Sequence, residues 1–292
     1  MLKITVLPEW RNQTLTELFR DTFHLGKKAR HELRMSPEFT LDGSDKPNWE
    51  GKLSAGQILT VPLQKENAAK IESGPLEVSY EDDFILVLNK PAGVKTHPNS
   101  PNETGTLANF AAAYLKHDPT SSPFAVHRLD QETSGLVLFA KNPLSLAAFS
   151  WQLEARNIHR TYLALVSGKT PETLTIQEPI GTDRHHPNKM RISASGKNAI
   201  THLERLETYP NDTSLVRLKL ETGRTHQIRV HLKSIGHPII GDHLYGGAKL
   251  AKRTLLHAEE LEFFHPFLNQ TLVVKKEPPS DFTIKKEPPN EA

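Results

Sequence analysis

The sequence predicts an α+β fold with a mixed or antiparallel sheet, and three observations support this. From Leu76 onward the pattern is rich in short strands, and an acidic turn at 81–83 separates the first two. Residues 136–140 form a short, continuous apolar run, which suits a strand buried on both faces. Helical periodicity is limited to a few segments among these strands, so one domain contains both kinds of element.

The elements of the main domain follow from periodicity and turn residues. Strands are expected at 76–80, 84–88, 136–140, 161–166, 200–206 and 215–220, and helices at 107–115, 143–156 and 226–235. The helix at 143 begins with Pro143, which suits a first helical turn. It carries Leu146, Phe149 and Leu153 on one face, as a helix packed against a sheet does.

The first 64 residues are expected to form a small α/β module. Apolar residues at three- and four-residue spacing predict a helix over 15–23, which Gly26 can end. A strongly basic helix is expected over 27–34. Strands are expected at 39–41 and 56–61, each next to a turn that contains glycine.

Composition places two further boundaries. The polar residues 65–75 are expected to link the module to a main domain that spans 76–283. The sequence Lys-Lys-Glu-Pro-Pro occurs twice in the tail, first at 275–279, and its prolines and low apolar content indicate a solvated segment. Residues 284–292 are expected to be disordered.

Composition also limits the possible functions. Of the 292 residues, 37% are hydrophobic and 24% charged, which suits a globular protein with a substantial core. The absence of cysteine excludes disulfides, thiolate catalysis and cysteine-ligated metal sites.

The N-terminus lacks the apolar core of a signal peptide, and no apolar run approaches the roughly 18 residues of a membrane span. A soluble, cytoplasmic protein without a membrane partner is expected.

Positive charge is concentrated in one region, although the whole chain carries a formal charge of only +2. Residues 156–233 contain thirteen Lys and Arg against seven Asp and Glu, a net charge of +6. A local positive field suits the phosphate backbone of a nucleic acid. A solvated basic face would show the same count, so charge alone leaves both interpretations open.

An aspartate stands at the entrance to the buried run. Residues 127–135 read His-Arg-Leu-Asp-Gln-Glu-Thr-Ser-Gly, and the carboxylate of Asp130 can accept the backbone N–H groups of the following turn. It can equally face a cleft as a nucleophile or base, in which case a nearby cation would keep it ionised. This segment alone leaves both roles open.

A second polar cluster occupies residues 221–231. Gly223 frees the backbone after a strand, and Thr225 can cap the helix that follows. Arg224 and Arg229 each present five donors, which suit bidentate pairing with a phosphate or a carboxylate. The cluster predicts an anion site of modest specificity.

The histidines do not have the spacing of metal ligands. His226, His231, His237 and His243 lie five, six and six residues apart, so none forms a helical pair four residues apart. The sequence also lacks a glycine-rich nucleotide loop with lysine and a Gly-x-Ser-x-Gly elbow. No metal site and no cofactor are expected.

Taken together, the motifs resemble those of RNA pseudouridine synthases of the large-subunit ribosomal RNA type. The signature is His-Arg-Leu-Asp-x-x-Thr-Ser-Gly-Leu-x-Leu-Phe-Ala-Lys at 127–141. Further matching segments appear in the order of that family, at 88–93, 160–168, 179–181, 223–231 and 241–246. The resemblance covers residues 75–283. It implies the pseudouridine synthase fold and the isomerisation of uridine to pseudouridine within RNA, with no cofactor or metal.

The resemblance also implies a set of site residues. Asp130 matches the catalytic aspartate, and Arg229 matches the cation that pairs with it and lowers its pKa. Tyr162 matches the aromatic residue beside the target base, and Ile228 the apolar residue below it. Arg128 matches the residue that fills the space vacated when the uridine is extruded from its stack.

Four more residues of these motifs are expected to bind RNA: His127, Arg160, Arg224 and His226. The expected partner is ribosomal RNA, with transfer RNA as the alternative, and the protein is expected to be a monomer. Two rival functions remain: a catalytically inactive RNA-binding protein on the same scaffold, acting in ribosome assembly, and a metal-dependent phosphoesterase.

The N-terminal module resembles more weakly the small RNA-binding domain first known from a small-subunit ribosomal protein. Gln13-Thr14-Leu15 stands where that domain has Arg-Leu-Asp. Residues 1–75 carry eleven basic and ten acidic side chains. This near balance leaves open whether the module binds RNA or acts as a spacer.

Overall fold

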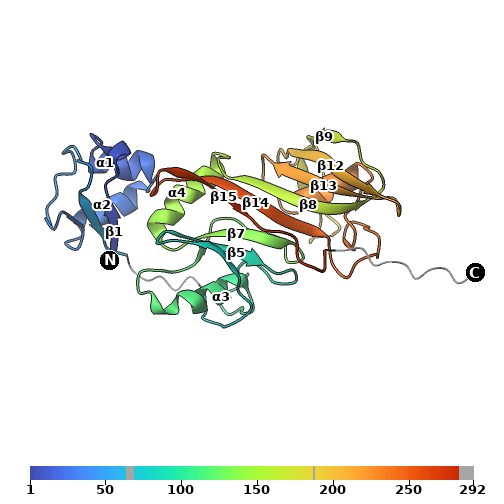
Figure 1. Cartoon of the computed structure of the whole chain (residues 1–292), viewed down its shortest axis with the longest axis horizontal. Helices are drawn as coiled ribbons and strands as arrows, with labels where there is room; N and C mark the ends of the chain where they lie inside the picture. The colour runs from blue at the N-terminus through green and yellow to red at the C-terminus, as the bar shows by residue number, and fades with distance from the viewer. Residues whose placement is uncertain (64–68, 187, 283–292) are drawn as a thin grey trace, which may run out of the picture.

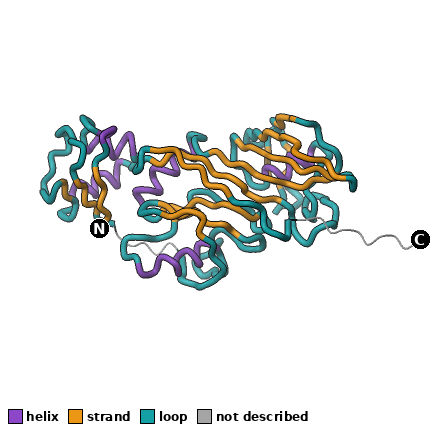
Figure 2. The backbone as a smooth tube through the Cα atoms, viewed as in Figure 1, coloured by secondary structure: helices purple, strands orange, loops and turns teal. Residues whose placement is uncertain are grey.

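The computed structural model describes residues 1–63, 69–186 and 188–282, and they form two lobes along one long axis (Figure 1). The N-terminal module is one lobe. The other is an elongated sheet whose strands run along the molecule, with helices packed around it (Figure 2). None of the described helices is both long and apolar enough to cross a membrane.

The N-terminal module contains a three-stranded antiparallel sheet in the order β1-β3-β2. Its elements are β1 (Leu2–Thr5), η1 (Pro8–Trp10), α1 (Leu15–Glu17), η2 (Leu18–Thr22), α2 (Lys27–Met35), β2 (Thr40–Leu41) and β3 (Ile58–Val61). A capping box starts α1: the Thr14 hydroxyl accepts from Glu17 N–H, and the Glu17 carboxylate accepts from Thr14 N–H. The two predicted helices and the strands β2 and β3 are confirmed, whereas β1 is an additional strand.

The main domain contains a ten-stranded sheet in the order β4-β5-β7-β14-β8-β13-β12-β9, with β6 also paired to β7 and β15 to β14. Only the β7–β14 pair is parallel among these described pairs, so the sheet is mixed and mainly antiparallel, as predicted. The strands are β4 (Val78–Glu81), β5 (Ile85–Lys90), β6 (Phe124–Ala125), β7 (Ser134–Ala140), β8 (His159–Ser167), β9 (Thr173–Ile176), β12 (Thr201–Tyr209), β13 (Thr213–Leu220), β14 (Leu256–His265) and β15 (Gln270–Lys275).

Outside this sheet, a separate hairpin consists of β10 (Ile180–Thr182) and β11 (Met190–Ile192). The helices are α3 (Leu107–Tyr114), η3 (Leu115–His117), α4 (Pro143–Glu154) and α5 (Gln227–Ser234). The three α-helices and the predicted strands of the main domain are confirmed, with boundaries that differ by a few residues. The Asn142 side chain caps α4 by accepting from Ser145 N–H at 2.9 Å, directly before the predicted Pro143.

Strand β7 is buried on both faces because a helix covers each of them. Leu136, Leu138 and Ala140 pack with α4 in one hydrophobic cluster. Val137 and Phe139 point the other way and pack with α3 in a second cluster. All seven residues of β7 are buried, which explains why the segment reads as a continuous apolar run rather than an alternating one.

Neither β14 nor β15 is predicted from the sequence pattern. Glu259, Glu260 and Glu262 break the apolar pattern of β14, and the strand contains an irregularity between Ala258 and Glu260 where its register with β8 shifts. Nevertheless β14 is central, because it lies between β7 and β8 and pairs with both. Its position is decided by its neighbours.

The first Lys-Lys-Glu-Pro-Pro copy and the residues after it are exposed at most positions, as a solvated segment predicts, but hydrogen bonds tie them to the main domain. Lys276 N–H donates to the Glu259 carbonyl at 2.8 Å. Asp281 accepts two hydrogen bonds from Arg253, at 2.7 and 2.8 Å, and Phe282 packs against the core. The predicted disordered residues 284–292 lie outside the described residues.

The expected linker, 65–75, is described only from residue 69. Its later part packs on α3: Asn109 Nδ2 donates to the Lys70 carbonyl at 2.8 Å, and Glu72 N–H donates to the Asn109 carbonyl at 3.4 Å. Gly74 lies against the ring of Phe110, where a Cβ atom would come within 2.2 Å. The described part of this segment is therefore fastened to the main domain.

Aromatic rings join the module to the sheet. Phe23 at the end of η2 stacks on Phe267, with ring centroids 4.6 Å apart, and Phe267 stacks on Phe84 at 4.1 Å. His24 stacks on Trp151 of α4 at 3.7 Å. Buried residues of the module and of one sheet face belong to a single hydrophobic cluster, so the two lobes share a core.

Phe267→Ala should therefore destabilise both lobes. Removing the central ring of this stack is expected to lower the free energy of unfolding by about 3–5 kcal/mol, measured by urea denaturation. Phe264→Ala is the control, because Phe264 is 42% exposed, and it should cost less than about 1 kcal/mol. Equal losses in the two variants would contradict a shared core.

Candidate active site

Asp130 lies in the loop that leads into β7, and hydrogen bonds anchor this loop on both sides of it. Leu129 N–H donates to Thr96 Oγ1, and the Thr96 hydroxyl donates to the Leu129 carbonyl, both at 3.1 Å. The Gln131 carbonyl accepts from Gly93 N–H at 2.8 Å, and the Gln131 side chain donates to the Gly93 carbonyl at 2.9 Å. These reciprocal pairs hold the backbone of Asp130 in place.

A buried lysine completes the anchoring. Lys90, at the end of β5, has no exposed surface, and its Nζ donates to the backbone carbonyls of Pro91, Val94 and Gln131 at 3.0, 2.7 and 3.0 Å. Three carbonyls match the three N–H donors of an ammonium group. Burial lowers the pKa of Lys90 to about 7, against the opposing effect of the nearby Asp130 charge.

A glycine allows β7 to begin close to β14. Gly135 has φ +114°, and a Cβ atom at this position would lie 2.3 Å from the Ala258 carbonyl oxygen. Gly135 is paired with Ala258 in the short parallel ladder between the two strands. Only glycine fits this approach, so the position of the Asp130 loop over the sheet depends on it.

The groups that face Asp130 come from β8 and the start of α5. Tyr162 lies on β8, and both it and Ile228 are buried, at 5% and 4% exposure. Burial raises the pKa of Tyr162. His226 caps α5 in the left-handed conformation, with φ 55° and ψ 22°, which histidine adopts more often than most residues.

A buried glutamine fixes the loop before α5. Gln227 Oε1 accepts from the Thr222 hydroxyl at 2.7 Å and from Arg224 N–H at 3.0 Å. Its Nε2 donates to the Ile200 carbonyl at 2.9 Å and to Thr201 Oγ1 at 3.0 Å. With the donors and acceptors of its amide all paired, Gln227 ties the segment that carries His226 and Arg229 to β12.

Arg229 is held mainly by Asp242 and reaches Asp130 with its remaining nitrogen. Its Nε and Nη2 donate to the two oxygens of Asp242 at 2.7 and 2.8 Å, and Nη1 lies 3.4 Å from Asp130 Oδ2. Asp242 has no exposed surface. Burial alone would lower the pKa of Arg229, but the bonds to Asp242 and Asp130 outweigh it, and the pKa is raised.

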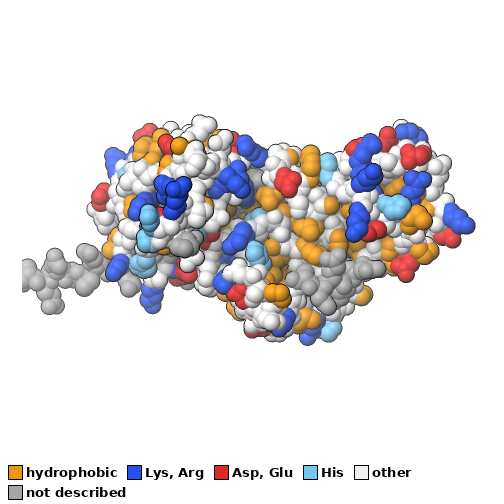
Figure 3. All heavy atoms as spheres, turned by 180° about the vertical axis from the view of Figure 1, so that it is seen from behind, with side chains coloured by type: hydrophobic (Ala, Val, Ile, Leu, Met, Phe, Trp, Pro, Cys, Tyr) orange, Lys and Arg blue, Asp and Glu red, His pale blue; other side chains and the backbone are white. Residues whose placement is uncertain are grey.

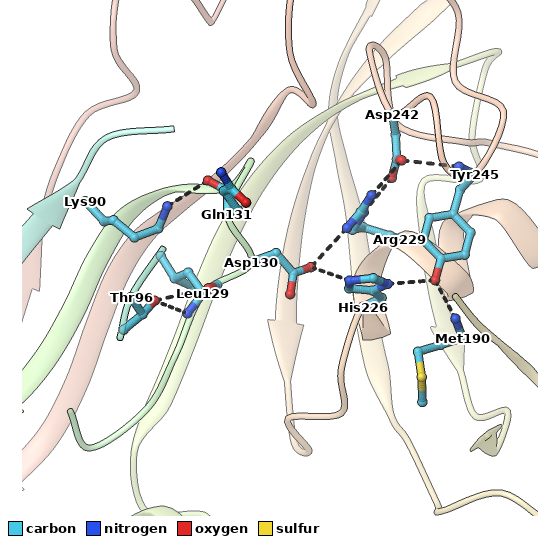
Figure 4. Close-up of polar contacts among 10 residues, drawn as sticks. All are labelled: Lys90, Thr96, Leu129, Asp130, Gln131, Met190, His226, Arg229, Asp242 and Tyr245. Atoms are coloured by element: carbon cyan, nitrogen blue, oxygen red, sulfur yellow. Dashed lines mark hydrogen bonds and ion pairs between the residues drawn. The ribbon is translucent and has the colours of Figure 1, made fainter. Parts of the chain in front are cut away.

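Figure 4 shows how His226 and Tyr245 extend this group. His226 Nε2 lies 3.8 Å from Asp130 Oδ2, and His226 Nδ1 lies 2.9 Å from the Tyr245 hydroxyl. Met190 N–H donates to the same hydroxyl at 2.9 Å. Asp130 is thus the end of a polar chain that begins in the β10–β11 hairpin.

Asp130 lines a cavity of about 570 Å³, which is within the usual range for ligand sites. Its apolar lining includes Leu129, Tyr162, Ile228 and Leu256. Five arginines also line it: Arg128, Arg156, Arg160, Arg224 and Arg229. An anionic molecule is favoured here, because these cations outnumber the lining carboxylates Asp130, Glu154 and Glu221.

Among the residues expected to bind RNA, Arg128, Arg160 and Arg224 do line the cavity. Arg128 is exposed beside Asp130. Arg224 is half-buried, and its Nε donates to the Asn198 carbonyl at 2.9 Å. Arg160 packs against Gly223, where a Cβ atom would lie 2.7 Å from its Nη1. The structure thus brings these three arginines into the lining of one cavity.

The two histidines expected to bind RNA, His127 and His226, are less exposed than Arg128. His127 is 7% exposed, and its Nε2 accepts from Leu138 N–H at 3.2 Å, so the ring supports β7. Burial lowers the pKa of His127 to about 3, which keeps the ring neutral. His226 lines the cavity but faces the Asp130 carboxylate.

Lys90, Asp242 and Tyr245 were not predicted as site residues. Lys90 lies in the segment 88–93, and Asp242 and Tyr245 lie in the segment 241–246. Both segments carry the family resemblance, and this was the sequence signal that could have identified the three residues. The sequence does not show that these segments meet the Asp130 loop, because the contacts join residues far apart in the chain. Within the described ranges, no group of three His, Cys, Asp or Glu side chains could hold a metal ion.

A carboxylate beside arginines in an open cavity is typical of an enzyme that acts on an anionic substrate. Comparison with known families specifies the substrate. Residues 84–234 match the RNA pseudouridylate synthase family, and residues 2–59 match the N-terminal domain of the RluD ribosomal pseudouridine synthase. The chain belongs to the RNA pseudouridine synthase family, and it is an isomerase that converts uridine in RNA to pseudouridine.

Individual relatives agree with this assignment. The uncharacterised RNA pseudouridine synthase YhcT of Bacillus subtilis is 44% identical over 232 residues, 77% of each chain. Ribosomal large subunit pseudouridine synthase D of Xanthomonas campestris is 37% identical over 299 residues, covering 94% of this chain and 84% of the relative. The human RNA pseudouridylate synthase domain containing 1 superposes with a TM-score of 0.60 at 30% identity, covering 72% and 87% of the two chains.

Lys90→Met should change stability in a pH-dependent way. The pKa of Lys90 is about 7 in the folded protein and near the ordinary 10.5 in the unfolded chain. Between these values the unfolded chain binds more protons, so the free energy of unfolding of the parent should rise with pH relative to the variant. Urea denaturation at about pH 7 and about pH 9 measures this difference.

Lys28→Met is the matched control, because the Lys28 side chain is 91% exposed, and its effect should not depend on pH in this range. A pH-independent difference between the parent and Lys90→Met would contradict the depressed pKa of Lys90.

Proposed function

We propose that this enzyme modifies ribosomal RNA and that Asp130 is its catalytic residue. The observation that carries the proposal is the placement of Asp130: a carboxylate fixed at the mouth of a buried strand, with one oxygen next to Arg229 in an arginine-lined cavity. The relatives named ribosomal large subunit pseudouridine synthase D support ribosomal RNA as the substrate. A ribosomal substrate also favours a cytoplasmic location.

The reaction breaks the bond from the ribose to a uracil nitrogen and makes a bond to a uracil carbon. Asp130 either adds to the nucleotide or removes a proton from its sugar, and both routes need the carboxylate in its ionised form. Arg229 places a positive charge 3.4 Å from Oδ2 and pairs with the carboxylate. Asp242 keeps the guanidinium in position, so Arg229 need not move during the reaction.

The apolar lining of the cavity suits a uracil ring that has left its stack. Tyr162 and Ile228 form two buried walls, at which the planar base can pack while it rotates. Extrusion of a base costs a few kcal/mol. Arg128 is exposed next to Asp130 and can enter the space that the uridine leaves, where its planar guanidinium stacks on neighbouring bases.

Basic side chains on both lobes suit a structured RNA longer than the target nucleotide. On the back face, lysine and arginine side chains gather over the N-terminal module and over the far end of the sheet, with hydrophobic side chains between them (Figure 3). Lys27, Lys28 and Arg34 of α2 are exposed. Because the lobes share a core, we propose that the module presents α2 to the RNA at a fixed distance from Asp130.

Asp130→Asn should abolish pseudouridine formation while leaving RNA affinity within a few-fold of the parent. The amide has the shape of the carboxylate but cannot act as a nucleophile or base. Purified variants are assayed for pseudouridine and for RNA binding, with Asp83→Asn in an exposed turn as the control. Pseudouridine formed by Asp130→Asn at the parental rate would disprove the catalytic role.

The identity of the substrate is tested in cells. Pseudouridine mapping across all stable RNAs, with and without the gene, should show sites in ribosomal RNA that disappear on deletion. Complementation with the parent should restore them, and complementation with Asp130→Asn should not. Loss confined to transfer RNA would contradict the ribosomal assignment while leaving the role of Asp130 intact.

A further inference from the structure

Tyr245 connects three elements at one hydroxyl group. It follows the segment that carries Asp242, its hydroxyl contacts His226 of the α5 cap, and Met190 N–H of β11 donates to that hydroxyl. The ring is 2% exposed, and the Arg229 guanidinium lies 5.0 Å from its centroid. Tyr245 N–H also donates to Asp242 Oδ1 at 3.2 Å. The hydroxyl is therefore held in position from several sides.

The hydrogen bonds of this hydroxyl define the tautomer of His226. A backbone N–H can only donate, so Tyr245 Oη accepts from Met190. The one hydroxyl proton is then available to His226 Nδ1, which lies 2.9 Å away. If Nδ1 carried the proton instead, the buried tyrosine proton would have no acceptor among the hydrogen bonds of the described residues. The arrangement favours a neutral ring with its proton on Nε2.

We propose that Tyr245 and His226 are positioning residues for Asp130: Tyr245 holds His226 as the Nε2–H tautomer, and this N–H faces Asp130 Oδ2. The proposal rests on the proposed catalytic role of Asp130. Arg229 Nη1 faces the same oxygen at 3.4 Å and His226 Nε2 at 3.8 Å. Both donors thus face Oδ2 (Figure 4), which leaves Oδ1 as the oxygen that meets the nucleotide in this proposal.

The electrostatic surroundings agree with this assignment. Burial lowers the pKa of His226, and the positive charges of Arg229 and Arg128 act in the same direction, while Asp130 and Asp242 oppose them. Burial raises the pKa of Tyr245 to about 12, so the phenol keeps its proton at neutral pH. A neutral imidazole and an intact phenol are the two forms that the proton arrangement requires.

The distance between His226 Nε2 and Asp130 Oδ2 determines how His226 acts on the carboxylate. At 3.8 Å the contact is longer than a hydrogen bond, so His226 does not tie up the carboxylate before the substrate binds. A small rotation of the Asp130 side chain would bring the two atoms into bonding distance. His226 then favours one rotamer of Asp130, in which Oδ2 is occupied and Oδ1 is open to the cavity.

Nitrogen NMR of the intact protein tests the tautomer directly. Protein labelled with ¹⁵N in its histidines is recorded at about pH 8, where neutral imidazoles predominate, and the His226 signals are identified by their absence in His226→Gln. In the parent, Nδ1 should have the shift of an unprotonated nitrogen and Nε2 that of a protonated one. In Tyr245→Phe the two signals should move toward the average of both tautomers. A proton on Nδ1 in the parent would overturn the proposal.

Kinetics test the consequence for catalysis. Tyr245→Phe should lower kcat roughly tenfold, as the loss of one positioning hydrogen bond predicts, with KM changed less than twofold. Tyr114→Phe is the control, because Tyr114 is 49% exposed and donates only to Glu81 at the surface, and its kcat should equal that of the parent. An unchanged kcat in Tyr245→Phe would contradict the positioning role.

Two substitutions of His226 distinguish the effect of the Nε2–H donor from the effect of the left-handed backbone conformation at this position. Glutamine places an amide N–H near the position of Nε2, whereas asparagine suits the left-handed backbone but is too short to reach Asp130. We expect kcat to fall more in His226→Asn than in His226→Gln, and the reverse order would overturn the proposal.

The NMR result does not depend on activity, so it tests the His226 tautomer separately from the catalytic role of Asp130.

Discussion

The buried ion pair between Arg229 and Asp242 is the interaction on which the rest of the site depends. Taking both charges out of water costs several kcal/mol, which only a bidentate geometry such as this one offsets. The pair directs the third nitrogen of Arg229 toward Asp130. Asp242 also receives the backbone N–H of Tyr245, so the same carboxylate places the cation and the start of the tyrosine–histidine contact. Removing Asp242 would take away the two short hydrogen bonds of Arg229 and leave its guanidinium with the 3.4 Å contact to Asp130.

The loop that carries Asp130 is also rigidly supported, by the strand that follows it and by residues near the end of β5. Strand β7 is covered by α4 on one face and by α3 on the other, so the strand cannot shift without disturbing both clusters. Lys90 and Thr96 then tie the loop to the segment after β5. Asp130 and the strand that supports it are adjacent in the chain, because β7 begins only four residues after Asp130.

The shared core of the two lobes extends this rigidity to the N-terminal module. The stack of Phe23, Phe267 and Phe84 lies between the lobes, and burial of such rings contributes strongly to stability. A module attached in this way presents its basic helix at a constant distance from the cavity. RNA contacts made by the module would therefore add to those at the cavity without the entropic cost of ordering a flexible arm.

The sequence by itself determined much of the local structure and pointed to Asp130 as the proposed catalytic residue. The helices that begin at Leu107 and Pro143, the buried strand at 136–140 and the aspartate before it follow from periodicity, from the proline in the first helical turn and from the motif, because these signals involve residues close together in the chain. It did not reveal β14, whose place between β7 and β8 comes from its neighbours, or the docking of residues 276–282. Nor did it reveal that Arg229 binds Asp242 first, that His127 is buried beneath the strand, or that Tyr245 orients His226. Only the tertiary structure decided these points, because each depends on which distant segments meet and on which donors remain unpaired when they do.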